Sequence, residues 1–115
     1  EIGETPIEAA RRETMEEVRV EPFGLTPVAE LSFIFTNGYS LFCHVFFASH
    51  YQGSPEETRE AAPFWCEEDS IPYHEMWADD GYWLPRALNG EYIRGKFIFD
   101  EDDMLSHDLQ HGRAH

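Results

Sequence analysis

Three carboxylates near the start of the sequence lie at helical spacing. Glu13, Glu16 and Glu17 stand at positions i, i+3 and i+4, so an α-helix would place them on one face. Like charges at this spacing destabilise an isolated helix by about 0.2–0.5 kcal/mol per pair. Arg12 can reach Glu8 or Glu16 and relieve part of the repulsion. A hard cation such as Mg²⁺ or Mn²⁺, which selects carboxylate oxygens, would relieve more. The spacing alone also fits a solvated acidic face.

A second group combines aromatic and acidic residues. Trp77 is followed by the adjacent acids Asp79 and Asp80. A purine can stack on an indole, an interaction worth about 1–3 kcal/mol in nucleic-acid complexes. Two adjacent carboxylates in a dry pocket cannot both ionise cheaply, so one tends to keep its proton. Such a pair donates and accepts hydrogen bonds, as the Watson–Crick edge of a purine requires. In the alternative interpretation Trp77 is a core residue and Asp79 only caps a helix.

The carboxylates at positions 13–17 need a helix to hold them. Thr5 is a good N-cap, Pro6 suits the first helical position, and Glu8 completes a T-x-x-E capping box. These signals predict a helix over about residues 6–18. Its expected inner face consists of Ile7, Ala10, Thr14 and Val18.

Runs of β-branched and aromatic residues predict the strands. Asn37-Gly38 is a strong hairpin signal, and Asn89-Gly90 is expected to end a second helix that Asp79 begins. The expected strands span residues 28–35, 41–48, 62–66 and 92–99, and residues after Asp100 are expected to form a loosely held tail. These elements predict an α+β fold or an α/β/α sandwich around a mixed β-sheet, in a single domain over 1–115.

The pattern Glu4-x7-Arg12-Glu13-x-x-Glu16-Glu17 resembles the Nudix box, Gly-x5-Glu-x7-Arg-Glu-U-x-Glu-Glu-x-Gly-U, where U is aliphatic. The resemblance implies the Nudix fold and makes Glu13, Glu16 and Glu17 metal ligands, with Glu13 or a nearby glutamate activating water. It also implies that Arg12 orients the glutamates and that Glu4 supports the loop.

The chain departs from the Nudix box in three places. Arg19 replaces the box glycine and Thr14 replaces an aliphatic residue. The leading glycine would fall before residue 1. We therefore expect an N-terminally truncated member that lacks the first strands of the fold.

The segment Trp77-Ala-Asp79-Asp80-Gly-Tyr-Trp83 resembles the Trp-x-Asp-Asp-x-Tyr-Trp segment of Nudix enzymes that hydrolyse oxidised purine nucleoside triphosphates. The resemblance implies a purine pocket and a further metal ligand, Glu60. It also places Leu41 and Ala61 where those enzymes have methionines. The implied substrate-binding residues are Phe33, Phe35, Trp77, Asp79, Asp80, Trp83 and Phe99.

The implied activity is Mg²⁺-dependent hydrolysis, with Mn²⁺ as an alternative metal, of 8-oxo-dGTP and 2-hydroxy-dATP to the monophosphate and pyrophosphate. Such an enzyme sanitises the nucleotide pool. Two alternatives stay open: a Nudix hydrolase acting on another nucleoside diphosphate-linked substrate, and a non-catalytic nucleotide-binding fragment.

Composition limits the partners. The chain has 115 residues, with 23 Asp plus Glu against 8 Lys plus Arg and a formal charge of −15. This charge would repel nucleic-acid polymers and disfavours a membrane surface, so a small polyanion would need a bridging cation. Hydrophobic content of 42% excludes a disordered acidic tail. We expect a cytoplasmic monomer.

The cysteines and the C-terminal histidines carry weaker signals. Cys43 and Cys66 are far apart and are expected to be reduced core thiols rather than a disulfide or metal pair. His107, His111 and His115 share an i, i+4, i+8 spacing that could bind a metal on a helix. A frayed tail with incidental histidines is the expectation.

Overall fold

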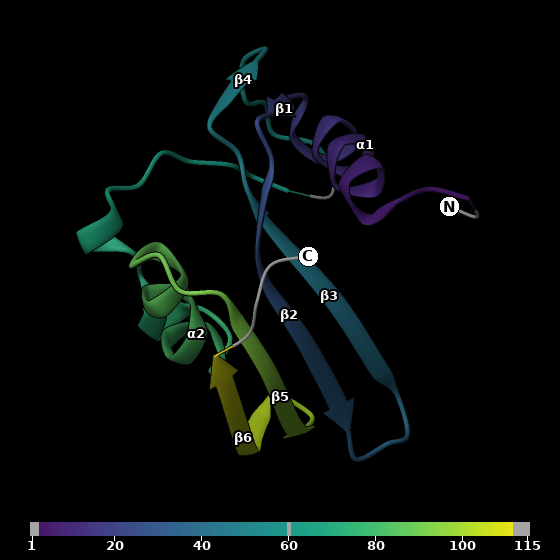
Figure 1. The fold of residues 1–115 in the computed structure, drawn as a ribbon, viewed down its shortest axis with the longest axis vertical. Coiled ribbons are helices and arrows are strands. Elements are labelled where there is room, and N and C mark those ends of the chain that lie inside the picture. Colours follow the sequence, from purple (N-terminus) through teal and green to yellow (C-terminus); the bar gives the residue numbers. More distant parts are fainter. Residues whose placement is uncertain (1–2, 60, 112–115) are drawn as a thin grey trace. The chain divides into compact units, whose positions relative to one another are not determined.

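The computed structural model describes residues 3–59 and 61–111. The chain divides into two compact units (Figure 1). We call Glu1–Thr26 with Phe46–Ser70 the helix unit, and Pro27–Val45 with Ile71–His115 the sheet unit.

The helix unit begins with α1, Pro6–Val18, at the predicted position. The Glu8 backbone N–H donates to Thr5 Oγ1 at 3.1 Å, and Glu8 Oε1 accepts from the Thr5 backbone N–H at 2.9 Å. This reciprocal pair is the capping box, and Pro6 occupies the first turn. The prediction of the helix and of its N-terminal cap is therefore confirmed.

The expected inner face of α1 is only partly buried. Ala10, Thr14 and Val18 are half-buried, whereas Ile7 is exposed. The expectation was therefore wrong for Ile7, whose side chain in the first turn is 37% exposed. Deeper burial in this unit lies at Val20, just after the helix.

Beyond α1, a two-stranded antiparallel ribbon pairs β1, Glu21–Phe23, with β4, His50–Gln52. The ribbon and α1 are joined by a hydrogen bond from Arg11 Nε to the Pro22 carbonyl at 3.3 Å. Residues 62–66 form no strand, so that prediction was wrong. Pro63 removes a backbone donor, and Phe64 and Trp65 are exposed. Cys66 is also exposed, which contradicts the expectation of a core thiol; Cys43 is half-buried.

The sheet unit contains a mixed sheet with strand order β3-β2-β5-β6 (Figure 1). Strand β2 runs parallel to β5, and β5 runs antiparallel to β6. The prediction of an α+β fold with a mixed sheet is confirmed. The strands are β2 Thr26–Phe35, β3 Ser40–Phe47, β5 Ile93–Asp100 and β6 Asp103–His111.

The hairpin between β2 and β3 turns at the predicted dipeptide. Gly38 has φ 94°, a value that favours glycine, and the Tyr39 backbone N–H donates to Asn37 Oδ1 at 2.9 Å. Strand β6 replaces the loosely held tail expected after Asp100, so that expectation was wrong through residue 111. Residues 112–115, including His115, lie outside the described residues.

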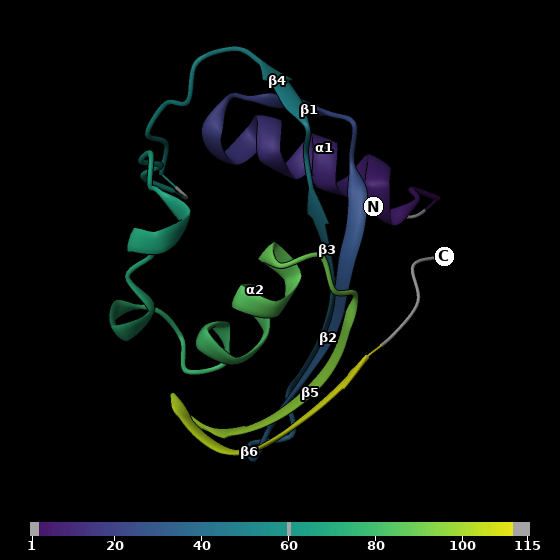
Figure 2. The ribbon, with the colours of Figure 1, turned by 60° about the vertical axis from the view of Figure 1, so that its left-hand side comes forward.

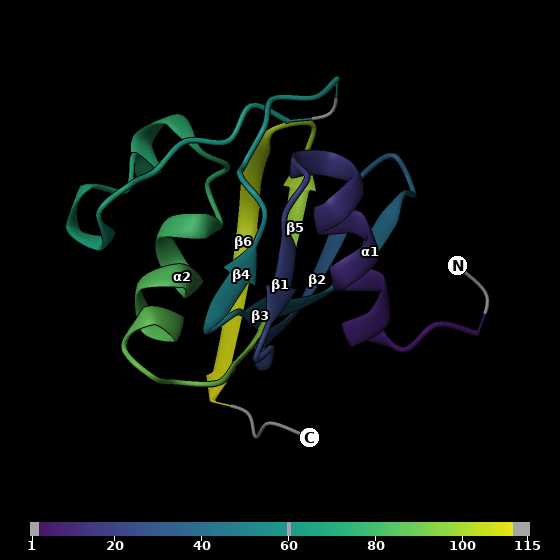
Figure 3. The same cartoon turned by 90° about the horizontal axis from the view of Figure 1, so that it is seen from above.

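Helix α2, Asp80–Leu88, contacts β5 on the concave side of the curved strands β5 and β6 (Figure 2). Figure 3 shows it again to one side of these strands. The alternation along β5 explains the packing, because Ile93, Gly95, Phe97 and Phe99 are buried while Arg94 and Lys96 are exposed. Two short 3₁₀ helices, Glu68–Ser70 and Tyr73–Glu75, precede α2. Among the described residues, no helix is long and apolar enough to cross a membrane.

Candidate active site

The acidic face of α1 is solvent-exposed. Glu13, Glu16 and Glu17 are all exposed. Arg12 lies between this face and the preceding loop. Its guanidinium donates to both carboxylate oxygens of Glu4, with Nε–Oε2 at 2.9 Å, and Nη1 lies 3.2 Å from Glu16 Oε2.

This forked ion pair fixes the Arg12 side chain. The hydrogen bonds from Arg12 lower the pKa of Glu4 to about 2, and the same contact raises the pKa of Arg12. A bidentate guanidinium–carboxylate pair restricts both groups more than a single contact does. Arg12 is therefore held against Glu4 while it reaches Glu16, and the carboxylate of Glu8, the alternative partner, accepts from the Thr5 backbone N–H in the capping box.

The carboxylates of α1 have the right chemistry for a hard divalent cation. They do not by themselves form a cage: within residues 3–59 and 61–111, no three His, Cys, Asp or Glu side chains come together to hold a metal ion. Glu60, the predicted further ligand, lies outside the described residues. Carboxylate oxygens therefore fit Mg²⁺ or Mn²⁺ as ligands. A complete metal site would need further ligands besides the side chains that come together within the described residues.

The loop after β4 is anchored on the C-terminal end of α1. The Glu56 backbone N–H donates to the Val18 carbonyl at 3.0 Å, and Thr58 Oγ1 donates to the Glu17 carbonyl. These bonds satisfy carbonyls that have no partner inside a helix. A Cβ at Gly53 would lie 2.8 Å from the Arg19 carbonyl oxygen, so this close approach requires glycine.

The loop and the helix end enclose a polar hollow of about 500 Å³. It contains one predicted site residue, Glu16. Its other lining residues have no role in the sequence motif, because their contact depends on tertiary packing; the one sequence signal was Arg19 in place of the box glycine. The full lining is Glu16, Arg19, Glu56, Glu57, Thr58 and Arg59.

The sheet unit holds an aromatic cavity of about 310 Å³. Residues from β2, β3, β5 and the segment that leads into α2 meet there, and Phe35 lies opposite Phe99 in the parallel register. Trp77 meets Phe99 edge-on, with ring centroids 5.6 Å apart. The lining comprises six of the seven predicted substrate-binding residues together with Leu41: Phe33, Phe35, Leu41, Trp77, Asp79, Asp80 and Phe99.

Trp83 is the predicted pocket residue that is not among the lining residues of the described chain. Its ring is buried, and its Nε1 donates to Asp79 Oδ2 at 3.0 Å. Trp83 therefore contacts the acid pair and not the space beside it. Its position on α2, four residues after Asp79, brings the two side chains to the same face of the helix.

The acid pair is poorly hydrated. Asp79 is 4% exposed, and burial raises its pKa although the Trp83 hydrogen bond lowers it. Burial, and then the charge of Asp79, raise the pKa of Asp80 to about 6. Near neutral pH this pair can hold a proton more readily than exposed acids do, so it can donate as well as accept hydrogen bonds.

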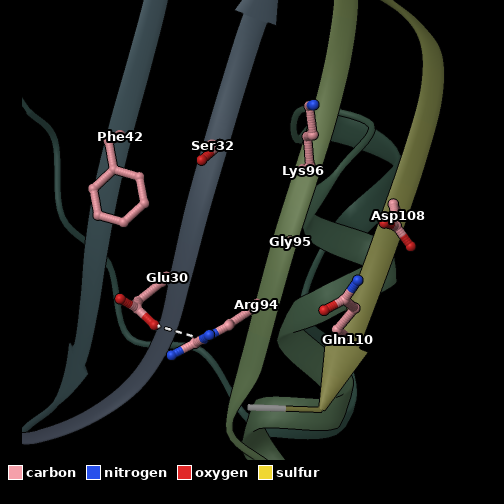
Figure 4. A pocket seen from close by; sticks show the side chains of 8 residues that line it. All are labelled: Glu30, Ser32, Phe42, Arg94, Gly95, Lys96, Asp108 and Gln110. Carbon is pink, nitrogen blue, oxygen red and sulfur yellow. Dashed lines mark hydrogen bonds and ion pairs between the residues drawn. The ribbon is translucent and has the colours of Figure 1, made fainter. Parts of the chain in front are cut away.

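The polar residues of the same strands form a different hollow of about 390 Å³ (Figure 4). Its side chains are polar apart from Phe42, and Arg94 Nε is paired with Glu30 Oε2 at 3.1 Å. It has no facing aromatic rings, so it does not fit a stacked base. The aromatic cavity is therefore the better candidate for a purine. Sequence reasoning did not find this second hollow, because its residues come together only in the sheet.

On β6, the histidines make contacts on a strand and not on a helix. His107 packs against Tyr82, with ring centroids 4.2 Å apart, and His111 Nδ1 lies 3.3 Å from Glu91 Oε1. The helical metal-binding alternative for these residues is therefore wrong within the described chain, since a strand does not bring positions i and i+4 one turn apart.

Comparison with known proteins identifies the family. The NUDIX domain matches residues 1–87. The chain is 38% identical over 110 residues to the oxidized purine nucleoside triphosphate hydrolase of Mus musculus, covering 94% of this chain and 70% of that protein. It is 37% identical over 106 residues to the protein of the same name from Danio rerio, covering 91% and 68%.

A solved structure shows the same fold. The crystal structure of the mutator protein MutT from Bacillus halodurans has a TM-score of 0.84 to this chain at 23% identity, covering 96% of this chain and 76% of that one. The family match and the two named relatives show that the chain belongs to the NUDIX family and is a Nudix pyrophosphohydrolase.

Proposed function

We propose that this protein hydrolyses oxidised purine nucleoside triphosphates, such as 8-oxo-dGTP and 2-hydroxy-dATP, to the monophosphate and pyrophosphate with a divalent cation. The observation that carries the proposal is the aromatic cavity. Asp79 and Asp80 line it together with Trp77 and with phenylalanines of β2 and β5. The names of the two relatives support the same substrate class. Removal of damaged nucleotides from the pool would be the biological role.

In this proposal the sheet unit recognises the base. Trp77, whose ring is exposed, offers aromatic surface for stacking, and Phe99 packs against this ring edge-on. The carboxylates of Asp79 and Asp80 contact the Watson–Crick edge, where an ionised acid accepts from ring or amino N–H groups and a protonated acid donates to a carbonyl oxygen. Because the proton can sit on either acid, the pair can match more than one oxidised purine. Trp83 is a positioning residue that holds Asp79.

The helix unit would serve the phosphates. Glu13, Glu16 and Glu17, with Glu60, would hold a divalent cation, Mg²⁺ or Mn²⁺. Such a cation, when bound, supplies charge neutralisation and polarises a phosphoryl oxygen. Glu13 or a neighbouring glutamate accepts a proton from the attacking water. Arg12, fixed by Glu4, orients Glu16.

The test is a comparison of turnover of 8-oxo-dGTP, 2-hydroxy-dATP and dGTP with Mg²⁺, with the products separated by anion-exchange chromatography. We expect the oxidised substrates to have the higher kcat/KM and to yield monophosphate and pyrophosphate. The double variant Glu16→Gln, Glu17→Gln should lose turnover, whereas Asp102→Asn, a change at an exposed turn, should retain it. Equal and negligible turnover of all three nucleotides would refute the proposal.

The alternative of non-catalytic nucleotide binding, raised by the sequence, predicts different results. In that case Mg²⁺ would not raise the unfolding temperature, and the Glu16→Gln, Glu17→Gln variant would bind nucleotide as the unaltered chain does. A Nudix hydrolase for another nucleoside diphosphate-linked substrate would instead retain turnover of that substrate in Asp79→Ala.

A further inference from the structure

Two arginines differ from the other arginines of the described chain. The guanidiniums of Arg19 and Arg59 make no ion pair or hydrogen bond within residues 3–59 and 61–111, and both line the polar hollow beside Glu16. The other described arginines each contact an acceptor. Those arginines are Arg11, Arg12, Arg86 and Arg94.

Arg19 occupies a backbone position that does not suit a long side chain. It ends α1 with φ 64° and ψ 29°, the left-handed region that L residues adopt rarely and glycine adopts readily. A glycine here would remove the strain, as the glycine of the Nudix box would. An observed outlier of this kind justifies asking what the side chain does, and here the side chain lines a cavity next to a box glutamate.

Hydrogen bonds hold the backbone of the loop before Arg59 against the end of α1 that carries Arg19. The bonds from Glu56 and Thr58 to the last carbonyls of α1 tie the loop before Arg59 to the helix end that carries Arg19. Preorganised cations bind an anion with less loss of conformational freedom than cations on a mobile loop.

The charges of the hollow select the ligand. It contains carboxylates as well as guanidiniums, and Glu16 is already paired with Arg12. A bare anion would meet the carboxylates of Glu56 and Glu57. A diphosphate carrying a divalent cation matches both signs, because carboxylates bind the cation and planar guanidiniums bind phosphate oxygens in pairs.

We propose that Arg19 and Arg59 bind the diphosphate part of the substrate, the part released as pyrophosphate. This inference rests on the proposed function for its reaction. It assigns to the two arginines a role in phosphate binding that the box carboxylates cannot fill, since their charge is of the same sign as the phosphates.

The experiment titrates the full chain with magnesium pyrophosphate by isothermal titration calorimetry. Arg19→Gln and Arg59→Gln should each weaken binding about tenfold, as expected for a charge-assisted hydrogen bond in a partly hydrated site. Lys96→Gln is the matched control, because it removes the same charge from an exposed site on β5 and should bind as the unaltered chain does. Arg19→Lys keeps the charge without the fork and should fall between Arg19→Gln and the unaltered chain.

Circular dichroism of each variant separates lost binding from lost folding, and Arg59→Gln, on an exposed loop residue, keeps the test open if a change at the helix end unfolds the chain. Failure to bind magnesium pyrophosphate, or equal binding by the two Gln variants and Lys96→Gln, would overturn the inference. Either result can occur while oxidised purine triphosphates are still hydrolysed. Arginine-dependent binding in a chain that fails the turnover test would uphold the inference and reject the proposed substrate.

Discussion

Replacing Asp80 with asparagine should make the protein more stable at neutral pH. The carboxyl group of Asp80 is half-buried next to Asp79, and its pKa is raised from 3.8 to about 6. A group whose pKa is higher in the folded state binds more protons there, so folding is opposed as the pH rises. Asparagine keeps the shape of the side chain and removes this titration.

The magnitude follows from the size of that rise. At 1.36 kcal/mol for each tenfold change, a rise from 3.8 to about 6 corresponds to about 3 kcal/mol. Partial exposure reduces this to about half, because water screens the charge. Asp80 also lies in the first turn of α2, where the helix dipole favours a negative charge by about 0.5 kcal/mol. The net gain for Asp80→Asn is therefore about 1 kcal/mol at pH 7.

The raised pKa of Asp80 makes the free energy of unfolding of the unaltered chain fall as the pH rises. Below pH 3.8 the carboxyl group is protonated in both states and the unaltered chain bears no penalty. Between pH 3.8 and about 6 the unfolded chain releases the proton while the folded chain keeps it, so the free energy of unfolding falls. Above about pH 6 the full penalty is present. The advantage of the variant should therefore grow between pH 3.8 and about 6 and level off above that.

Urea unfolding followed by circular dichroism at half-unit steps from pH 4.5 to 7.5 measures the effect. Asp102→Asn, in the exposed turn between β5 and β6, makes the same chemical change outside the cavity and should give a curve parallel to that of the unaltered chain. If Asp80→Asn also runs parallel, or is less stable at pH 7, burial does not raise the pKa of Asp80.

Three further changes test local contacts. Trp83→Phe removes the donor to Asp79, which is 4% exposed, and should lower the free energy of unfolding in urea by about 1–3 kcal/mol; an unchanged value would mean that this bond contributes nothing. Thr5→Ala breaks the capping box with Glu8 and should cost about 1 kcal/mol with a loss of helical ellipticity, whereas no change in either would show that α1 does not depend on its cap. Arg19→Gly, at φ 64°, should raise the stability by about 0.5–1 kcal/mol, since the relief of about 1–2 kcal/mol exceeds the entropy that glycine loses on folding; a lower unfolding temperature in calorimetry would contradict that account.

The elements that could be predicted are those whose signals are local. The capping box at Thr5 and the turn at Asn37-Gly38 each lie within a few residues, and both form as predicted. Strand β6 could not be predicted, because Met104 and Leu109 are its half-buried apolar residues and most of its other positions are exposed. Backbone hydrogen bonds to β5 keep β6 in the sheet, and these bonds do not require apolar and polar side chains to alternate along the strand.

In the candidate site too, some features follow from local sequence signals and others depend on tertiary contacts. The positions of Glu13, Glu16 and Glu17 on one helix face follow from their spacing alone. The cavity depends on Phe35 lying opposite Phe99, a parallel pairing of strands far apart in the sequence that periodicity cannot show. The family resemblance supplied that grouping. The hollow with Arg19 and Arg59 was missed because a loop must fold back onto the end of α1 to create it.

At the start of α2, the side chain of Asp79 does not cap the helix. An aspartate before a helix ordinarily accepts from a backbone N–H of the first turn. Here Asp79 has αR angles and makes no such bond; the Asp80 N–H donates to the Trp77 carbonyl instead, and the Asp79 side chain accepts from Trp83. Because backbone carbonyls hold the first turn, the carboxylate is available to the cavity that it lines. A strong capping residue that does not cap, buried beside a second acid, departs from the local rule for helix starts, and such departures are expected where a side chain serves a site.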